Sequence, residues 1–252
     1  MVSESSLPEG PAFYAQPSFL TRPRWREWWT VLHPPYTMLH LALVTVGACL
    51  TGPVNTVHWI ATLLAFFLAV GIAAHALDEL NGRPLSTTIP ARQLIAAAIV
   101  GLGGAVALGI AGLFLVNGYL AIFIVIGLLA AVGYNLELFG GRLHTSLVFA
   151  LSWGAFPILT AYFAQHGTLS LASFVAASFG ALVVKVQQVL STPARDLRRR
   201  VASIEGSYLR VDGSRDPITK ESLLRPYERA LKALCSMGVA LAVALALNQY
   251  IH

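Results

Sequence analysis

Three long stretches without a single Asp, Glu, Lys or Arg constrain this chain more than any other feature of its sequence. They cover residues 28–77, 93–136 and 143–184. A helix of about 20 apolar residues crosses a bilayer once, and each stretch is about twice that long. Each stretch therefore predicts two transmembrane helices joined by a short turn.

The overall composition supports a membrane protein. Of the 252 residues, 56% are hydrophobic and 12% are charged, against roughly 25% charged in an ordinary soluble domain. This composition excludes a disordered chain, a disulfide scaffold and a nucleic-acid-binding domain. Cys49 and Cys235 lie far apart in apolar segments without a motif, so we expect them to be core residues. The first 30 residues contain three glutamates and no apolar run, so we expect no cleavable signal peptide.

The N-terminal part divides into two segments. Residues 1–21 are rich in Pro and Gly and are predicted to be a flexible tail. Residues 22–34 interleave arginines with tryptophans, which is typical of a segment in the headgroup region of a bilayer. Residues 35–252 then form a single transmembrane domain, with a cytoplasmic loop at about 195–230.

The turn residues within the charge-free stretches set the expected helix boundaries. Thr51-Gly-Pro, Asn117-Gly118 and His166-Gly167 each divide one stretch into two helices. We expect an all-α, multi-pass bundle of about seven helices around a central cavity that opens to the cytoplasmic side. The predicted helices cover residues 35–51, 57–77, 93–116, 119–136, 143–164, 169–193 and 231–250.

The basic residues give an independent indication of topology. The N-terminal segment and the loops after the second, fourth and sixth helices hold 16 of the 17 Lys and Arg residues, and Lys185 lies within the sixth helix. The other loops hold none, and every Asp and Glu falls on the basic side. The positive-inside rule then predicts a protein of the cell membrane with its N-terminus in the cytoplasm and its C-terminus outside.

The first candidate cluster lies at the cytoplasmic end of the second helix and comprises His75, Asp78, Glu79, Asn81 and Arg83. Positions 75, 78 and 79 lie within one helical turn and could converge. Mg²⁺ usually takes one or two carboxylates together with substrate phosphate oxygens. The cluster predicts a magnesium site, although the same residues could simply terminate a membrane helix.

The second cluster lies on the sixth helix. Lys185, Gln188, Thr192 and Asp196 fall on one stripe about 80° wide, on an otherwise apolar helix. A lysine within a membrane costs on the order of 3 kcal/mol unless it faces a cavity or a partner. The stripe therefore favours a polar cavity, and a structural lysine paired with a buried acid is the alternative.

The third cluster ends the fourth helix and contains Tyr134, Asn135 and Arg142. The tyrosine and asparagine can hydrogen-bond a polar ligand, and an arginine can pair with phosphate. Arg142 could equally be a topology marker. The three clusters together provide acids for a metal and bases for an anion, with apolar helices behind them. This combination fits a diphosphate attached to a hydrocarbon tail, whose allylic cation an apolar chamber would shield from water.

In the order of these parts the chain resembles the UbiA superfamily of intramembrane prenyltransferases, over roughly residues 25–205. The resemblance implies a ring of helices around a cavity, two aspartate-rich motifs that bind Mg²⁺, an isoprenoid diphosphate and a hydrophobic acceptor. By position, Asp78 and Glu79 match the first motif, with His75 where the family usually has Asn, and Asp196 matches the second. The resemblance rests on Arg24-Trp-Arg-Glu-Trp-Trp, His33-Pro-Pro-Tyr, Asn81-Gly-Arg-Pro-Leu, Tyr134-Asn135 through Arg142, Ser152-Trp-Gly-Ala-Phe-Pro and Ala194-Arg-Asp-Leu-Arg-Arg-Arg-Val. The basic ligands of the diphosphate would come from Arg83, Arg142, Lys185 and Arg195.

The chain also departs from the family pattern. The acids of its first motif are adjacent, its second motif has one aspartate, and two of the usual nine helices are missing. Two alternatives to prenyl transfer or cyclisation therefore stay open. One is a different metal-dependent enzyme with Zn²⁺ or iron at His75, Asp78, Glu79 and Asp196. The other is a non-catalytic membrane protein that binds a lipid or quinone. The sequence gives no indication of oligomeric state.

Overall fold

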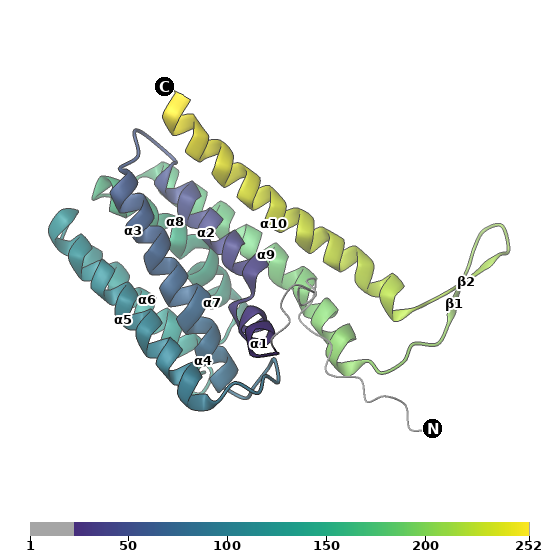
Figure 1. Cartoon of the computed structure of the whole chain (residues 1–252). Coiled ribbons are helices and arrows are strands. Elements are labelled where there is room, and N and C mark those ends of the chain that lie inside the picture. The colour runs from purple at the N-terminus through teal and green to yellow at the C-terminus, as the bar shows by residue number, and fades with distance from the viewer. Residues whose placement is uncertain (1–22, 252) are drawn as a thin grey trace.

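The computed structural model describes residues 23–251, so the predicted flexible tail lies outside the described residues. The chain is a bundle of long helices with one small β-hairpin (Figure 1). In chain order, the helical elements are α1 (Pro23–Leu32), α2 (Pro34–Ala48), α3 (Thr56–Phe66), η1 (Phe67–Ala74), α4 (His75–Leu80), α5 (Ala91–Leu115), α6 (Leu120–Asn135), α7 (Ser146–Ala150), η2 (Leu151–Ala155), α8 (Phe156–His166), α9 (Leu171–Arg200) and α10 (Lys220–Ile251). The hairpin strands are β1 (Ser207–Leu209) and β2 (Arg215–Pro217).

Five helices in the described part of the chain are long and apolar enough to cross a membrane. They cover Thr56–Leu80, Ala91–Leu115, Ser146–His166, Leu171–Arg200 and Lys220–Gln249. The α2 and α6 helices, with 15 and 16 residues, stand at the positions of two further predicted helices but are shorter. The prediction of an all-α protein is confirmed, and several of its helices are long and apolar enough to cross a membrane.

Two helices extend further than the sequence predicts. Helix α9 continues through Pro193 to Arg200, and α10 begins at Lys220 rather than near residue 231. The extension is stabilised by contacts between the two helices, since Ala194 and Leu224 are buried against each other and Arg198 donates to Glu228 with its Nε at 2.7 Å. The expected long cytoplasmic loop is reduced to residues 201–219, which contain the hairpin.

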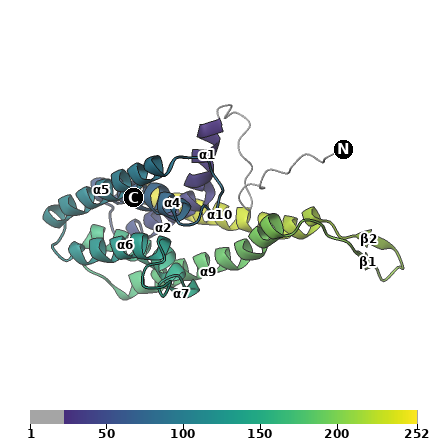
Figure 2. The ribbon, with the colours of Figure 1, turned by 90° about the horizontal axis from the view of Figure 1, so that it is seen from below.

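The C-terminal end of α9, the hairpin and the N-terminal end of α10 therefore form an arm, defined here as residues 191–232. Figure 2 shows the arm extending away from the other helices, with the hairpin at its tip. The segment expected at the membrane interface is α1, a short helix that ends where α2 begins at Pro34.

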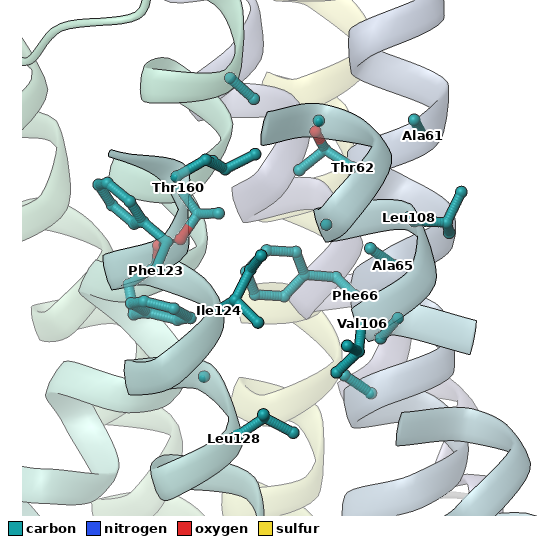
Figure 3. Close-up of a pocket in the computed structure, with 18 of the residues that line it drawn as sticks. Ala61, Thr62, Ala65, Phe66, Val106, Leu108, Phe123, Ile124, Leu128 and Thr160 are labelled. Atoms are coloured by element: carbon teal, nitrogen blue, oxygen red, sulfur yellow. Dashed lines mark hydrogen bonds between the residues drawn. The ribbon is translucent and has the colours of Figure 1, made fainter. Parts of the chain in front are cut away.

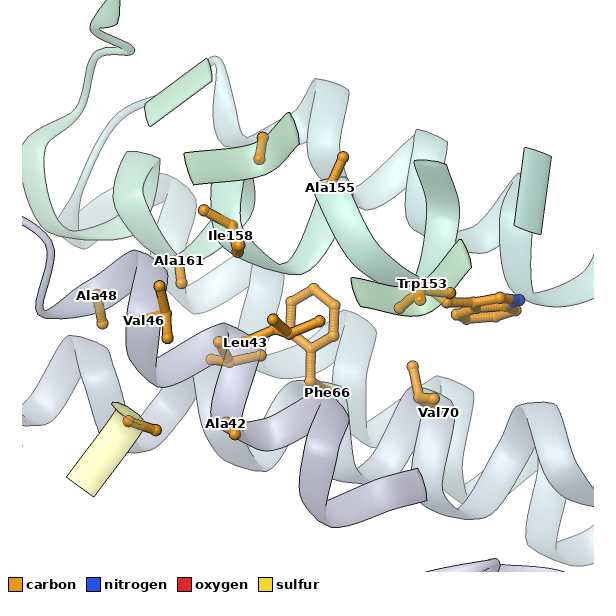
Figure 4. Packing of buried hydrophobic residues seen from close by; sticks show 14 of the residues in the cluster. Ala42, Leu43, Val46, Ala48, Phe66, Val70, Trp153, Ala155, Ile158 and Ala161 are labelled. Carbon is orange, nitrogen blue, oxygen red and sulfur yellow. The ribbon is translucent and has the colours of Figure 1, made fainter. Parts of the chain in front are cut away.

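The core lies where α2 packs against α8 and α10. Leu43, Phe66 and Ile158 are buried at its centre (Figure 4). Gly47 allows the closest approach of α2 to α8, because a Cβ there would lie 2.3 Å from the backbone oxygen of Ile158. Small residues at helix contacts are typical of membrane bundles, where close backbone packing replaces the hydrophobic effect.

The same principle explains Gly101, Gly104 and Gly109 on α5. A Cβ at Gly101 would meet the backbone oxygen of Leu68 at 2.5 Å, and one at Gly104 would meet the Leu68 side chain. Gly109 similarly faces Ile124 on α6. Gly103 has open space around it. These contacts hold α5 against η1 and α6.

Two of the helices that are long and apolar enough to cross a membrane contain a π-helical segment. In η1 and η2 the backbone is wound more widely than in an α-helix, which inserts an extra residue and locally changes the direction of the side chains. Such segments occur frequently at functional sites. Here η1 carries Val70 and leads directly into His75, and η2 carries Trp153.

Candidate functional site

A polar cavity of about 430 Å³ lies among α2, α4, α6 and α9. Helices from distant parts of the sequence thus contribute to one site, as the sequence predicts for the ends of the second, fourth and sixth helices. Seven of the predicted site residues line the cavity, namely His75, Asp78, Asn81, Tyr134, Asn135, Gln188 and Arg195.

Two asparagines fix the wall between α4 and α6. The Asn81 side-chain nitrogen donates to the backbone oxygen of Asn135 at 3.2 Å. The Asn135 side-chain nitrogen donates in turn to the backbone oxygen of Ala131 at 2.7 Å. The first of these bonds gives a partner to the carbonyl of the last residue of α6, which the helix itself leaves without one. This arrangement holds the end of α4, and with it Asp78, beside Tyr134.

Glu79 does not line the cavity, contrary to its predicted place beside Asp78 in a metal site. Its side chain is 0% exposed. Its two carboxylate oxygens accept hydrogen bonds from the backbone nitrogen of Leu85 at 2.9 Å and from the nitrogen and hydroxyl of Thr87 at 2.9 and 2.8 Å. Adjacent helical residues point about 100° apart, so Asp78 and Glu79 face different surroundings. Glu79 therefore stabilises the loop after α4.

Four other predicted site residues also lie outside the cavity lining. Arg83 donates to the backbone oxygen of Ile89 at 2.7 Å and belongs to the same loop. Lys185 is exposed and donates to the hydroxyl of Ser146, which donates to Gln188. Asp196 lies 3.5 Å from Arg200, on the exposed side of α9. Arg142 is exposed in the loop after α6.

The predicted metal ligands consequently do not assemble. Within residues 23–251 no group of three or more His, Cys, Asp or Glu side chains is placed to hold a metal ion. Of the four predicted ligands, His75 and Asp78 line the cavity, whereas Glu79 and Asp196 do not. Asp78 could still share a single Mg²⁺ with phosphate oxygens, since Mg²⁺ commonly takes one carboxylate from the protein.

The cavity is also lined by residues that the sequence did not predict as site residues. His33, Tyr36, Thr37 and His40 line it from the start of α2. Their spacing is that of one helical face, so a polar stripe on this helix was a signal in the sequence. Arg199 joins them from α9, one turn beyond Arg195.

The histidines lie close together. The rings of His33 and His75 have centroids 4.9 Å apart, and His75 Nδ1 lies 3.2 Å from the backbone oxygen of Gly71. Burial lowers the pKa of His33 well below its usual value, and the nearby His75, Arg199 and Arg195 lower it further. Burial therefore favours the neutral form of His33, while Arg195 and Arg199 bring positive charge to the cavity.

A second cavity, of about 340 Å³, is almost entirely apolar. It lies among α3, α5, α6 and α8, and Figure 3 shows Phe66, Phe123, Ile124 and Leu128 around it. On α5 it extends from Leu102 to Val116, or about 21 Å at the helical rise per residue.

The two cavities meet at a common wall. Val70 of η1 and Trp153 of η2 line both of them. Trp153 also contacts His40 and Tyr134 edge-on, with ring centroids 5.7 and 6.0 Å apart. Val70 and Trp153 therefore stand between the polar cavity and the apolar one.

Comparison with models of protein families, with curated proteins and with solved structures found no match to this chain.

Proposed function

We propose that this protein is a UbiA-like intramembrane enzyme that acts on an isoprenoid diphosphate, either transferring the prenyl chain to a hydrophobic acceptor or cyclising it. The observation that carries the proposal is that a polar and an apolar cavity lie side by side and share Val70 and Trp153 in their lining. One cavity is polar and contains two arginines, and the other is apolar and deep. Their shapes and chemistry match the two halves of a prenyl diphosphate.

Each cavity would have a separate task. Arg195 and Arg199 would bind the diphosphate through charge-assisted hydrogen bonds. Asp78 would hold Mg²⁺ together with the phosphate oxygens, and this ion would help neutralise the pyrophosphate as it leaves. The apolar cavity would hold the hydrocarbon tail and keep water away from the carbocation.

The proposal includes an orientation in the membrane. We propose seven spans, with α2 and α6 added to the five longer ones, the N-terminus in the cytoplasm and the C-terminus outside. The support is the distribution of Lys and Arg, which fall on one side only. In this orientation the polar cavity, at the ends of α4 and α6 and beside Arg195, opens toward the cytoplasm.

The proposal is tested with the purified full-length protein in nanodiscs. A panel from dimethylallyl to geranylgeranyl diphosphate is incubated with and without Mg²⁺, and released pyrophosphate is measured. We expect Mg²⁺-dependent release, and a loss of at least about 100-fold in Asp78→Asn and about 10-fold in Arg195→Gln. Glu221→Gln is the matched control, because this carboxylate lies on α10 and outside the cavity lining.

The Asp196→Asn variant tests whether Asp196 binds metal, as the family resemblance implies, or lies outside the site, as its position beside Arg200 indicates. The family resemblance places Asp196 in the second metal motif, whereas its carboxylate is exposed beside Arg200. We expect Asp196→Asn to keep most of the activity. If wild type releases no pyrophosphate from any member of the panel, the enzymatic proposal is wrong.

A second candidate function is a non-catalytic one, in which the same cavities bind a lipid or quinone. It is favoured by one observation, the failure of the predicted metal ligands to assemble within the described chain. Native mass spectrometry of the purified protein distinguishes the two. A co-purifying lipid or quinone together with an inactive diphosphate panel supports the binding protein. Stoichiometric zinc or iron would instead support the other metal-dependent enzyme.

A further inference from the structure

The β-hairpin at the tip of the arm is a formed structural unit. Strands β1 and β2 pair antiparallel, with Tyr208 opposite Asp216. The turn between them is closed by a hydrogen bond from the Arg210 nitrogen to the Ser214 oxygen at 2.8 Å. Asp212 accepts from the nitrogen and hydroxyl of Ser214, and these bonds lower the pKa of its carboxyl group. Arg210 also pairs with Asp216, its Nε at 2.6 Å.

This unit exposes its apolar side chains. Tyr208 is 51% exposed, Leu209 is 68% exposed and Val211 is fully exposed. A two-stranded hairpin alone in water is at best marginally stable. The hairpin therefore needs a surface that covers these three side chains.

The position of the hairpin indicates what that surface is. The hairpin connects α9 and α10, both of which are long and apolar enough to cross a membrane. Figures 1 and 2 show that it extends from the tip of the arm, away from the helix bundle. If α9 and α10 cross a membrane, the surface nearest to the hairpin is therefore that of the neighbouring lipid rather than that of the bundle.

The charge of the arm is complementary to an anionic bilayer. Between Asp196 and Lys232, leaving out Arg199 of the polar cavity, the chain has eight Lys and Arg residues and six Asp and Glu residues, a difference of two positive charges. The cytoplasmic leaflet, on which the basic residues are predicted to lie, has a negative surface potential that attracts basic segments. Tyrosine and arginine next to aliphatic residues are also the composition of membrane-interface anchors.

We propose that the β1–β2 hairpin lies on the surface of the bilayer and inserts Tyr208, Leu209 and Val211 at the boundary between headgroups and acyl chains of anionic phospholipids. The hairpin then fixes the free end of the arm to the membrane. This inference is independent of the proposed enzymatic activity, because it uses no residue of either cavity.

The experiment measures whether position 211 reaches the acyl chains. The full-length protein carries Cys49→Ala and Cys235→Ala, plus Val211→Cys labelled with bimane. It is placed in nanodiscs of phosphatidylglycerol or phosphatidylcholine that contain lipids with a nitroxide on the fifth acyl carbon. The control label is Glu221→Cys, an exposed position on the arm outside the hairpin. Each labelled protein must have the same elution volume and the same melting temperature as the unlabelled parent.

In phosphatidylglycerol nanodiscs we expect the label at position 211 to be quenched at least twofold more than the label at position 221. In phosphatidylcholine nanodiscs the label at position 211 should be quenched less than in phosphatidylglycerol. Amide hydrogen exchange at 207–217 should slow at least tenfold in phosphatidylglycerol relative to detergent, and Leu209→Asp should abolish this protection. Equal quenching at the two positions overturns the proposal. Protection from aqueous iodide without acyl-chain quenching also overturns it, because a protein partner or a second copy would then cover the hairpin.

Discussion

The Oε1 atom of Glu79 accepts hydrogen bonds from both the backbone nitrogen and the hydroxyl of Thr87, at 2.9 and 2.8 Å. A side chain that the sequence places in a metal site is thus committed to holding the loop after α4. The carboxylate of the adjacent Asp78 faces the cavity. The two neighbouring carboxylates therefore have different roles, since that of Glu79 is structural. This relationship gives the first prediction.

Replacing Glu79 with Ala should strongly destabilise the protein. The substitution leaves the backbone nitrogens of Leu85 and Thr87 and the Thr87 hydroxyl without their acceptor. Each buried unsatisfied group costs about 1–3 kcal/mol, so we expect the free energy of unfolding to fall by at least about 3 kcal/mol. Unfolding by titration with sodium dodecyl sulfate measures it. Glu221→Ala should change it by less than about 0.5 kcal/mol, and equal effects of the two would contradict the structural role.

Gly154→Ala should separate η2 from α9. A Cβ at position 154 would lie 2.4 Å from the backbone oxygen of Gly180, so the two helices would have to move apart. We expect a loss of about 1–3 kcal/mol in the same unfolding titration. Gly103→Ala on α5 is the matched control, since nothing lies within 4 Å of its Cβ position. There alanine should raise stability slightly through its higher helix propensity. A stable Gly154→Ala variant would show that this contact is looser than described.

Filling the apolar cavity should weaken the binding of prenyl diphosphates with long hydrocarbon tails. Ala65 lines this cavity (Figure 3), so Ala65→Phe places a ring where a tail would lie. We expect the affinity for geranylgeranyl diphosphate to fall at least tenfold, with little change for dimethylallyl diphosphate, as measured by isothermal titration calorimetry. Leu64→Phe is the control, because Leu64 is exposed and is not part of the cavity lining. Equal loss for both ligands would argue that the tail lies elsewhere.

The proposed orientation predicts which loops react with a membrane-impermeant maleimide in intact cells. Gly118→Cys lies in the exposed turn between α5 and α6, and Glu205→Cys lies in the exposed loop of the arm. The native cysteines are both buried and should not react. We expect labelling at position 118 in intact cells and at position 205 only after permeabilisation. The reverse pattern would invert the topology, and labelling of both positions in intact cells would change the number of spans.

Much of the helical architecture could be predicted because charge in a membrane is costly wherever the rest of the chain lies. The charge-free stretches placed most helices to within a few residues, and the turns at Gly52, Gly118 and Gly167 separated them as expected. The exceptions are the extensions of α9 and α10. Those segments carry charged side chains, and they stay helical in contact with each other, where Arg198 pairs with Glu228.

The site could be predicted only in part. The ends of the second, fourth and sixth helices do meet, so Asp78, Asn135 and Arg195 share a cavity. Whether Asp78 or Glu79 faces that cavity depends on the path of the loop after α4, which folds back onto Glu79. No local sequence pattern encodes this path. The sequence shows Arg199 as a basic residue one helical turn after Arg195. Its place beside His33, however, depends on how α9 packs against α2.

The sequence by itself therefore determined that this chain is helical and where its apolar helices lie, because these follow from the local sequence of each segment. Only the tertiary structure decided which polar side chains share the cavity, that Glu79 stabilises the loop instead, and that Val70 and Trp153 line both a polar cavity and an apolar one. Those outcomes depend on the faces that packed helices present to each other, which the π-helical segments η1 and η2 redirect.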